Sequence, residues 1–378
     1  MVATPRAPDT ANTLTDWLTL YHAPGVGVAC FRQLLKAFPE PADVLHASRD
    51  RLQALGLATH TIDALQHPDQ AGLDRDLAWR EQTGNRILTC RDPAYPMLLL
   101  EIPDPPPLLY VHGNVEVLGL PQLAMVGSRN PTPSGMRTAT EFAQYLSTAG
   151  LVITSGLALG IDAASHQGAL DAGGPTIAVM GTGLDRVYPA RHRDLARRIA
   201  AAGALVSEFP VGTAPRPENF PRRNRILSGL SLGTLVVEAA PRSGSLISAR
   251  CAGDQGREVF AIPGSIHNPL ARGCHALIKQ GAKLVETAQD VLDELGALAA
   301  ACTGARPDPA AQQTREQSGQ LAPEYLQLID SIGFEPTSID HLVNTSGLTP
   351  AEVSSMLLLL EMQGYIAASP GGIYNRLK

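Results

Sequence analysis

The sequence of 378 residues has few lysines, no long apolar run and no paired cysteines, and each lack excludes a class of protein. A transmembrane helix is excluded because no run of about 18 apolar residues occurs. The N-terminal residues contain no apolar segment typical of a signal peptide, so we expect a cytoplasmic protein. The five cysteines form no CxxC pair, which argues against disulfide frameworks and zinc sites and favours reduced thiols.

Sequence signatures of several phosphate and hydrolase chemistries are also missing. None of the four lysines follows a glycine, so a Walker A loop is excluded. The GxGxxG pattern fails because a segment starting at Gly181 has Arg186 where the third glycine belongs. The HExxH pattern does not occur, and the histidines show no ligand spacing. We therefore expect neither a cofactor nor a metal ion.

The charges are distributed unevenly, although the net charge is −6. Residues 186–225 contain nine arginines and three acidic residues, whereas residues 286–340 contain ten acidic residues and two arginines. A basic patch in an acidic protein indicates one anionic ligand in one place. The charge pattern argues against a protein that covers nucleic acid with its whole surface.

The central part of the chain, residues 86–296, alternates apolar runs with amphipathic helices. This pattern is typical of a parallel sheet covered on both faces, so we predict a Rossmann-like, doubly wound α/β domain. The expected strands are at residues 108–112, 123–127, 152–154, 176–180, 204–208, 234–238, 259–262 and 283–285. The expected helices are at residues 134–149, 161–172, 191–202, 218–230, 245–255 and 271–279.

Smaller units are expected on both sides of this domain. In the helical unit of residues 1–85, the turn Pro24-Gly25-Val26-Gly27 resembles a helix-hairpin-helix (or SAM-like) turn, which suits a phosphate; a plain glycine-capped turn is the alternative. Residues 297–320 are predicted to be a linker. Residues 321–378 resemble a winged helix, but their third helix contains no Lys or Arg. We therefore favour a protein-contact or regulatory role for this unit over binding to duplex DNA.

The binding chemistry is expected at the carboxyl ends of the parallel strands. Five loops rich in Gly, Ser or Arg follow strands there, at residues 127–129, 155–160, 181–183, 242–245 and 263–265. Small residues let backbone amides approach a ligand, and helix starts favour an anion. Five such loops, with Arg129 and Arg242 among them, predict an extended ligand that carries phosphates.

The most specific segment is residues 220–226, because Arg222, Arg223, Asn224 and Arg225 occupy the first turns of a predicted helix. Guanidinium groups match phosphate oxygens bidentately, so we interpret the segment as a phosphate clamp, with a solvated basic face as the alternative. Tyr188 follows the loop at residues 181–183. We interpret it as a platform on which a base stacks, with a half-buried core tyrosine as the alternative.

Six segments in this order closely resemble the DNA-processing protein A family (DprA, also called Smf). They are Gly127-Ser128-Arg129, SGLALGIDAASH (155–166), GTGLDRVYP (181–189), FPRRNRILSGLS (220–231), SGSLISA (243–249) and VFAIPGS (259–265). The resemblance implies a homodimer that binds single-stranded DNA without known enzymatic activity. It also implies that DNA covered by single-strand-binding protein is protected and handed to a RecA-type recombinase during natural transformation.

The family resemblance and the arginine clusters together predict one DNA-binding groove. Its expected residues are Ser128, Arg129, Gly156, Gly160, Gly181, Gly183, Tyr188, Arg191, Arg222, Arg223, Asn224, Arg225, Ser243 and Ser245. Relatives often carry Lys where this sequence has Ala190, and we expect Arg191 to supply that charge. The dimer surface is expected at residues 266–279.

The predicted mechanism is binding without bond breaking, in which four arginines hold the backbone of an unpaired strand and no base sequence is recognised. About four neutralised phosphates would give a slope of log affinity against log salt near −3. The alternative function is a nucleoside-monophosphate phosphoribohydrolase of the lysine-decarboxylase-like family. Its signature, PGGxGTxxE, is only echoed at residues 233–238, where Glu238 is either a leftover acid or a capping residue.

Overall fold

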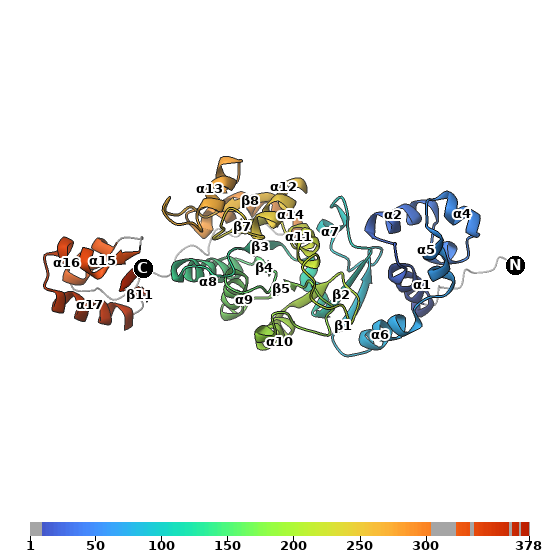
Figure 1. The fold of residues 1–378 in the computed structure, drawn as a ribbon, viewed down its shortest axis with the longest axis horizontal. Helices are drawn as coiled ribbons and strands as arrows, with labels where there is room; N and C mark the ends of the chain where they lie inside the picture. The colour runs from blue at the N-terminus through green and yellow to red at the C-terminus, as the bar shows by residue number, and fades with distance from the viewer. Residues whose placement is uncertain (1–9, 304–322, 333–335, 363–364, 370–371, 378) are drawn as a thin grey trace.

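A computed structural model describes residues 10–303, 323–332, 336–362, 365–369 and 372–377, and within these residues the largest feature is a nine-stranded sheet. The strand order is β1-β2-β6-β5-β4-β3-β7-β8-β9 (Figure 1). The strands are β1 (Asn85–Thr89), β2 (Leu108–Gly113), β3 (Gln122–Val126), β4 (Val152–Ser155), β5 (Thr176–Val179), β6 (Ala204–Ser207), β7 (Gly233–Val236), β8 (Glu258–Ala261) and β9 (Lys283–Leu284).

Neighbouring strands are parallel along the sheet order β6-β5-β4-β3-β7-β8-β9. Strands β1 and β2 extend the β6 edge of the sheet by antiparallel pairing. From β3, in the middle of the sheet, the chain proceeds outward through β4, β5 and β6, and it returns to β7 on the other side of β3. The order β5-β4-β3-β7-β8-β9 is that of a doubly wound Rossmann sheet. The predicted fold class is therefore confirmed.

Both faces of the sheet are covered by helices because successive side chains of each buried strand point to opposite faces. Leu123 and Met125 of β3 pack in the cluster that includes residues of α8, α9 and α14, whereas Ala124 and Val126 pack in the cluster with α11, α12 and α13. The helices of this domain are α7 (Met97–Leu100), α8 (Pro133–Thr148), α9 (Ile161–Asp171), α10 (Arg193–Ala202), α11 (Asn219–Gly229), α12 (Ser245–Asp254), α13 (Arg272–Lys279) and α14 (Ala288–Thr303), with short 3₁₀ helices η1 (Val115–Gly119) and η2 (Ala190–His192).

All eight predicted strands occur, with shifts of one or two residues at their ends. Strand β1 (Asn85–Thr89) was not predicted, because its five residues, NRILT, are too short and too polar to stand out from a loop. Helix α14 extends to Thr303, so the first seven residues of the expected linker, 297–303, are helical. The remainder of that linker, residues 304–320, lies outside the described residues.

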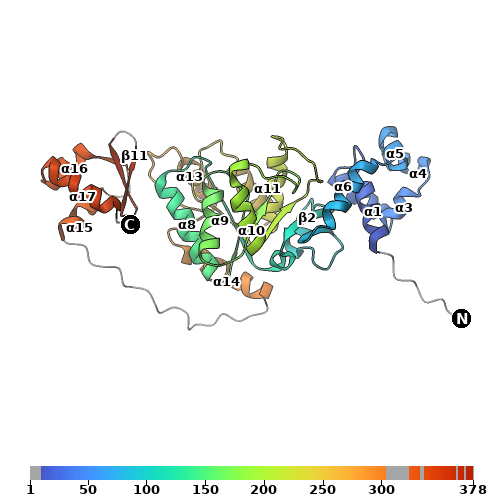
Figure 2. The same cartoon turned by 90° about the horizontal axis from the view of Figure 1, so that it is seen from below.

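The N-terminal helices share a hydrophobic core with the edge of the sheet. Trp17 and Phe31 stack with ring centroids 5.4 Å apart, and the same apolar cluster continues through Trp79 to Leu108 and Tyr110 of β2. Figures 1 and 2 both show α6 beside β2. The N-terminal unit is therefore packed onto the Rossmann-like domain. Its helices are α1 (Thr10–His22), α2 (Val28–Ala37), α3 (Pro41–Leu45), α4 (Arg49–Ala54), α5 (Thr59–Gln66) and α6 (Gln70–Arg80).

A buried carboxylate fixes this packing. Asp76 of α6 is fully buried, and it accepts hydrogen bonds from the hydroxyl of Tyr110 and, at 3.0 Å, from the amide of Val211. The ring nitrogen Nε2 of His22 lies 2.7 Å from the same carboxylate. Because a buried carboxylate without partners is costly, these three partners hold α1, α6, β2 and the segment after β6 in one arrangement.

The C-terminal unit has the element order of a winged helix, as the sequence predicts. A three-stranded sheet, β10-β12-β11, packs with three helices around an apolar cluster of its own. Residues 370–371 of the expected hairpin turn lie outside the described residues. Among the described residues, no helix is both long and apolar enough to cross a membrane. The elements of the unit are α15 (Pro323–Ile332), β10 (Thr337–Ser338), α16 (Ile339–Ser346), α17 (Pro350–Met362), β11 (Ile366–Ser369) and β12 (Ile373–Arg376).

Candidate nucleic-acid interface

A cleft of about 730 Å³ lies at the carboxyl ends of β3 and β7. These neighbouring strands are followed by connections that go to opposite sides of the sheet, and this switch point is where doubly wound proteins bind ligands. The loop after β4 and the first turn of α11 complete the walls. The residues around the cleft include Ser128, Arg129, Asn130, Ala158, Asp162, Tyr188, Phe220, Pro221, Arg223, Asn224, Arg242, Ser243, Gly244, Ser245 and Ile247.

Three guanidinium groups line this cleft, those of Arg129, Arg223 and Arg242. Arg129 and Arg242 are exposed, whereas Arg223 is only 5% exposed. Within the described part of the chain, none of the three has a protein hydrogen-bond or ion-pair partner. Of the residues that the structure describes, Asp162 alone contributes a carboxylate to the lining of the cleft. The cleft therefore carries an excess of positive charge, which suits an anionic ligand.

An aromatic pair forms one wall of the cleft. The rings of Tyr188 and Phe220 lie 5.5 Å apart with an angle of 47° between their planes, and the guanidinium carbon of Arg129 lies 6.0 Å from the centre of the Phe220 ring. Tyr188 is 46% exposed, so one face of its ring is free to contact a ligand. An exposed aromatic ring beside arginines is the arrangement in which an unpaired base stacks near its phosphate.

Hydroxyl and amide side chains supply the remaining polar groups of the cleft. Ser243 Oγ and Ser245 Oγ lie 2.7 Å apart, and Ser128 Oγ accepts the amide of Asn130 at 3.1 Å. Asn224 donates to the carbonyl oxygen of Gly244 at 3.5 Å, which is a weak bond at the limit of the accepted distance. The structure thus brings Ser128, Asn224, Ser243 and Ser245 into the same cleft as Arg129, Arg223 and Tyr188.

The backbone amides of the predicted loops play a different role from the expected one. Gly156 and Ala158 donate to the carboxylate of Asp162 at 3.1 and 3.2 Å, and Ile161 donates to the carbonyl oxygen of Ser128 at 3.1 Å. Gly183 donates to the carbonyl oxygen of Thr213 at 3.1 Å. These amides are already hydrogen-bonded inside the protein. The charge of the cleft therefore comes from side chains more than from the amide cradle that the sequence suggested.

The glycines of these loops permit close packing between loops. A Cβ atom on Gly156 would collide with the guanidinium group of Arg223, and one on Gly160 would collide with the carbonyl oxygen of Ser128. Gly160 also has a φ of +76°, which disfavours any other residue. Gly181 packs against the Phe220 ring, and neither it nor Gly183 lines the cleft. The loop at residues 263–265 does not line the cleft either, so three of the five expected loops converge there.

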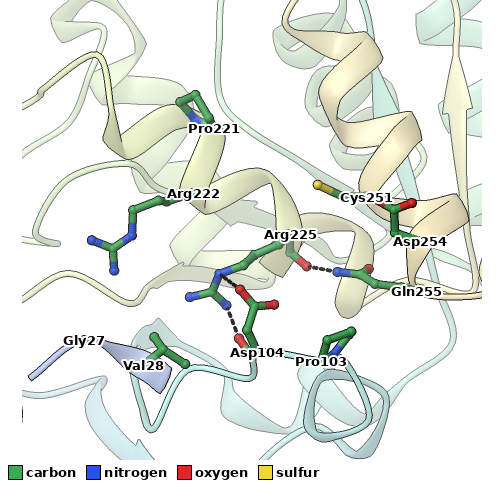
Figure 3. A pocket seen from close by; sticks show the side chains of 10 residues that line it. All are labelled: Gly27, Val28, Pro103, Asp104, Pro221, Arg222, Arg225, Cys251, Asp254 and Gln255. Atoms are coloured by element: carbon green, nitrogen blue, oxygen red, sulfur yellow. Dashed lines mark hydrogen bonds and ion pairs between the residues drawn. The ribbon is translucent and has the colours of Figure 1, made fainter. Parts of the chain in front are cut away.

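Arg222 and Arg225 point away from the cleft. They line a second pocket of about 610 Å³ on the other side of α11, opposite Gly27 and Val28 at the start of α2 (Figure 3). Residues three apart lie on one face of a helix, which places Arg222 with Arg225 and separates both from Arg223. The turn at Pro24–Gly27 consequently faces the Rossmann-like domain, and Asp104 and Asp254 share its pocket.

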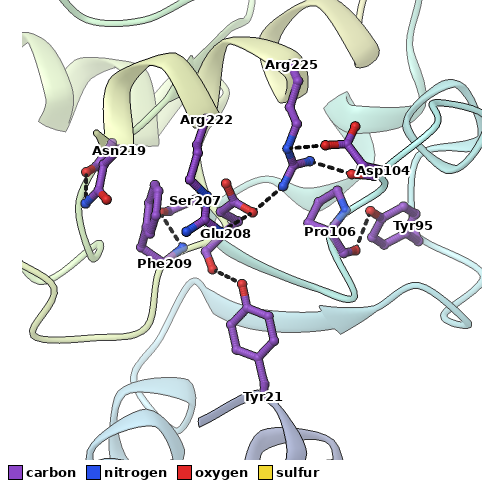
Figure 4. Close-up of polar contacts among 11 residues, drawn as sticks. Tyr21, Tyr95, Asp104, Pro106, Ser207, Glu208, Phe209, Asn219, Arg222 and Arg225 are labelled. Carbon is purple, nitrogen blue, oxygen red and sulfur yellow. Dashed lines mark hydrogen bonds and ion pairs between the residues drawn. The ribbon is translucent and has the colours of Figure 1, made fainter. Parts of the chain in front are cut away.

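Arg225 is part of a buried ion-pair network (Figure 4). Its guanidinium group contacts the carboxylate of Glu208, lies 3.1 Å from the carboxylate of Asp104, and donates to the Asp104 carbonyl oxygen at 2.7 Å. Glu208 is fully buried, and burial raises the pKa of its carboxyl group above the usual value. The positive charges of Arg225 and Arg222 oppose this shift. Arg222 lies 3.5 Å from the same carboxylate and is 53% exposed. The guanidinium charge of Arg225 is thus matched inside the protein.

Arg191 lies outside the cleft. It is exposed in η2, directly after Ala190, and is not among the residues that line the cleft. Because η2 follows Tyr188 by two residues, Arg191 is near the aromatic wall along the chain. Its predicted role in replacing the basic residue missing at Ala190 stays a prediction.

Glu238, the candidate acid of the alternative function, caps a helix. Its carboxylate accepts the hydroxyl of Thr132 at 2.6 Å and the amide of Thr132 at 2.9 Å, and Thr132 in turn caps α8 through the amide of Gly135. A Cβ atom on Gly135 would collide with this carboxylate. Of the two interpretations of Glu238, the structure favours the capping residue, and it does not place Glu238 among the residues that line the cleft.

Several residues that line the cleft were not among the predicted site residues, including Asn130, Asp162, Phe220 and Ile247. A signal existed for Asp162, because an acidic residue in the first turn after a glycine-rich loop commonly accepts backbone amides. Phe220 and Ile247 carried no such signal, since a lone apolar residue near a helix start usually belongs to the core.

The buried His166 and the four described cysteine side chains fit structural roles. His166 is fully buried with Nδ1 2.7 Å from Thr176 Oγ1, and burial lowers its pKa to about 3. Cys274 is buried and free, and Cys30, Cys90 and Cys251 are half-buried and free. The side chain of Cys302 is not described. No group of three or more metal-ligating side chains occurs among the described residues.

The fold and the cleft together define a class of protein: a doubly wound α/β protein with a basic, partly aromatic cleft at its switch point, flanked by a helical unit and a winged helix. A family model described as "DNA recombination-mediator protein A" matches residues 86–296, and one described as "DprA winged helix domain" matches residues 307–372. The chain belongs to this family of DNA-processing recombination mediators, as its six sequence motifs predicted.

Relatives with established names support this assignment. Protein Smf of Escherichia coli (strain K12) is 43% identical over 331 residues, covering 86% of this chain and 87% of that protein. DNA processing protein DprA of Streptococcus pneumoniae is 49% identical over 203 residues, covering 54% of this chain and 72% of that protein. The X-ray structure of DprA from Streptococcus pneumoniae matches with a TM-score of 0.66 and 39% identity over 74% of this chain and 97% of that chain.

A second solved structure similar to this chain is of a relative for which a single-stranded DNA binding mode is described. It is that of DNA processing protein A from Helicobacter pylori, which matches with a TM-score of 0.52 and 29% identity. The match covers 56% of this chain and 96% of that chain.

Proposed function

We propose that this protein binds single-stranded DNA in the cleft at the switch point, without breaking or forming covalent bonds. The observation that carries this proposal is the convergence of three guanidinium groups without protein partners, Arg129, Arg223 and Arg242, beside the exposed ring of Tyr188. The described binding mode of the Helicobacter pylori relative supports the choice of ligand.

Each group of the cleft has a separate task in this mechanism. The guanidinium groups of Arg129 and Arg242 are exposed and take the phosphates of the strand. Tyr188 and Phe220 form the wall on which a base stacks, an interaction of roughly 1–3 kcal/mol per base that tolerates any sequence. Ser243, Ser245 and Asn224 hydrogen-bond to the sugar or phosphate. Because none of these groups depends on the edge of a particular base, binding is independent of sequence.

Membership of the family supports a proposal for the biological role. We infer that the protein protects single-stranded DNA, accepts it from single-strand-binding protein and loads a RecA-type recombinase during natural transformation. A homodimer would present two clefts to one strand. Residues 266–279 are the proposed dimer surface, and Ile266, which is 72% exposed, gives that surface an apolar contact.

The salt dependence of binding tests the cleft directly. Each phosphate neutralised on a single strand contributes roughly −0.7 to the slope of log affinity against log salt, so Arg129 and Arg242 predict a slope of about −1.4 for a strand without terminal phosphates. Replacing Arg129 by Ala should weaken binding of a fluorescently labelled 20-mer of arbitrary sequence about tenfold and reduce the slope to about −0.7. Fluorescence anisotropy at four or more salt concentrations measures both quantities.

A matched control is available in the N-terminal unit. Arg49 of α4 is partly exposed and pairs with Asp63 at 2.7 Å, so Arg49→Ala should change neither affinity nor slope. Unchanged binding by the Arg129 variant, with the fold intact by circular dichroism, would remove the cleft from the proposal. Release of free adenine from AMP would instead favour the phosphoribohydrolase.

A further inference from the structure

Arg223 is a buried cation without a hydrogen-bond partner in the described protein. It is 5% exposed, it lines the floor of the cleft, and its Nε atom is buried with no acceptor. A buried guanidinium group normally has a carboxylate or carbonyl partner, because an unpaired buried charge is costly. Arg225, two residues further along α11, has such partners in Glu208 and Asp104. The structure therefore leaves the Arg223 charge open toward the cleft.

Asp162 does not serve as the missing ion-pair partner of Arg223. Its carboxylate lies near enough to affect Arg223 electrostatically, but it forms no ion pair with the guanidinium group. One oxygen of that carboxylate accepts the amides of Gly156 and Ala158. The bare Cα of Gly156 lets the guanidinium group approach the loop, and a Cβ there would collide with it. The loop thus makes room for Arg223 without neutralising it.

The depth of Arg223 distinguishes between two kinds of phosphate. A phosphodiester within a strand has a sugar on each side, so both neighbouring nucleotides would have to enter the cleft before it could reach the floor. A phosphate monoester has three free oxygens, carries a charge of about −2 at pH 7, and needs no chain beyond it. Arg129 and Arg242 at the rim add two further positive charges, against one carboxylate. The charge excess and the depth both favour a monoester.

We propose that the floor of the cleft, around Arg223, is a subsite for a phosphate monoester, which a DNA strand presents at its end and a nucleoside monophosphate presents by itself. Ser243 and Ser245 share one hydrogen bond between their hydroxyls, so one of the two O–H groups remains to donate to the monoester. The cleft volume of about 730 Å³ accommodates a nucleotide with its base against Tyr188. This inference rests on the proposed single-strand function and adds to it a preference for phosphorylated ends.

The first experiment uses the wild-type protein and one oligonucleotide in four forms. A 20-mer with hydroxyl groups at both ends is compared by anisotropy with the same 20-mer carrying a 5′ phosphate, a 3′ phosphate or both. A charge-assisted hydrogen bond to a buried arginine predicts that at least one terminal phosphate tightens binding about tenfold. Competition by dAMP and by inorganic phosphate, with deoxyadenosine as the uncharged control, tells a free monoester from a strand end.

Two variants connect the effect with Arg223. In Arg223→Met the ratio between the affinities for phosphorylated and unphosphorylated 20-mers should fall to about one, whereas Arg129→Gln should weaken both and leave the ratio well above one. Gly156→Ala should act like Arg223→Met, because the new Cβ displaces the guanidinium group. Gly253→Ala in α12 is the control, since nothing lies within 4 Å of an added Cβ there. Circular dichroism establishes that each variant is folded.

The outcomes separate this inference from the function on which it rests. Equal affinities for all four 20-mers would overturn the end subsite and leave single-strand binding in place. A phosphate preference that survives in the Arg223 and Gly156 variants would place the monoester elsewhere and also overturn it. Absence of binding to every oligonucleotide would instead remove the proposed function itself. Competition by dAMP without any preference among the 20-mers would limit the subsite to free nucleotides and contradict end recognition.

Discussion

The arginines of α11 differ in what surrounds each guanidinium group, although they are nearly adjacent in the chain. Arg223 faces the floor of the cleft without a partner, whereas Arg225 contacts two carboxylates and is 8% exposed. Arg222 lies between these extremes, half exposed over the ring of Phe209 at 5.3 Å. A charge that is already matched by buried carboxylates stabilises the fold, and a charge without a partner is available to a ligand.

This difference predicts opposite effects of substitution at Arg225 and at exposed positions. Arg225→Met leaves the buried carboxylate of Glu208 with Arg222 alone, so we expect the free energy of unfolding to fall by about 3 kcal/mol. Arg250 of α12 is exposed and has no ion pair among the described residues, so Arg250→Met serves as the control, with a change below about 0.5 kcal/mol. Urea unfolding measures both. A stable Arg225 variant with weakened DNA binding would return Arg225 to the groove.

At the scale of elements, helix α8 depends on a residue from the other side of the switch point. Glu238, after β7, accepts the amide and hydroxyl of Thr132 at the start of α8. The two loops that form the cleft are therefore held to each other by this contact. Unsatisfied amides at a helix start are costly, and a carboxylate also interacts favourably with the positive end of the helix dipole.

The contact between Glu238 and Thr132 predicts that a substitution at Glu238 lowers stability without weakening the binding of single-stranded DNA. Glu238→Gln keeps the size of the side chain but removes the charge, so we expect the free energy of unfolding to fall by about 1–3 kcal/mol. The control is Glu141→Gln, which removes a surface pair with Arg137 and should cost less than about 0.5 kcal/mol. Single-strand affinity of the folded Glu238 variant should match the wild type. An AMP-cleaving activity that disappears in this variant would contradict the capping role.

At the scale of the whole molecule, the winged helix has a core separate from that of the Rossmann-like domain. Helix α17 carries no basic residue, and Leu358 and Leu359 on it are exposed at 60% and 43%. A helix that enters a groove of duplex DNA brings positive charge to the phosphates. A helix with exposed leucines and no basic residue instead fits a protein partner.

Deletion of residues 304–378 tests this division of tasks. We expect single-strand affinity to stay within about twofold of the full chain, because independent sites contribute nearly additively. Gel shifts with single-stranded and duplex DNA of one sequence measure both activities. A loss of single-strand affinity greater than about tenfold would show that the winged helix contributes to the groove.

The sequence by itself determined the sheet, its class and the family. Apolar strands that alternate with amphipathic helices indicate a parallel sheet with both faces covered, because such strands are buried between two layers of helices. This alternation is a local property of the sequence, so it can be recognised without the structure. The helical period also implies that Arg223 lies on a different face of α11 from Arg222 and Arg225, since residues three apart share a face. The six ordered motifs likewise needed no structure.

The tertiary structure alone decided which face of α11 meets the cleft and which charges are matched. Glu208 and Asp104 are distant from Arg225 in the chain, and Glu238 is distant from Thr132, so no local pattern connects them. The loop amides donate hydrogen bonds to Asp162, Ser128 and Thr213, so they are not available to a ligand. Charge becomes available to a ligand only where folding leaves it without a partner, and partners are chosen in space rather than along the sequence.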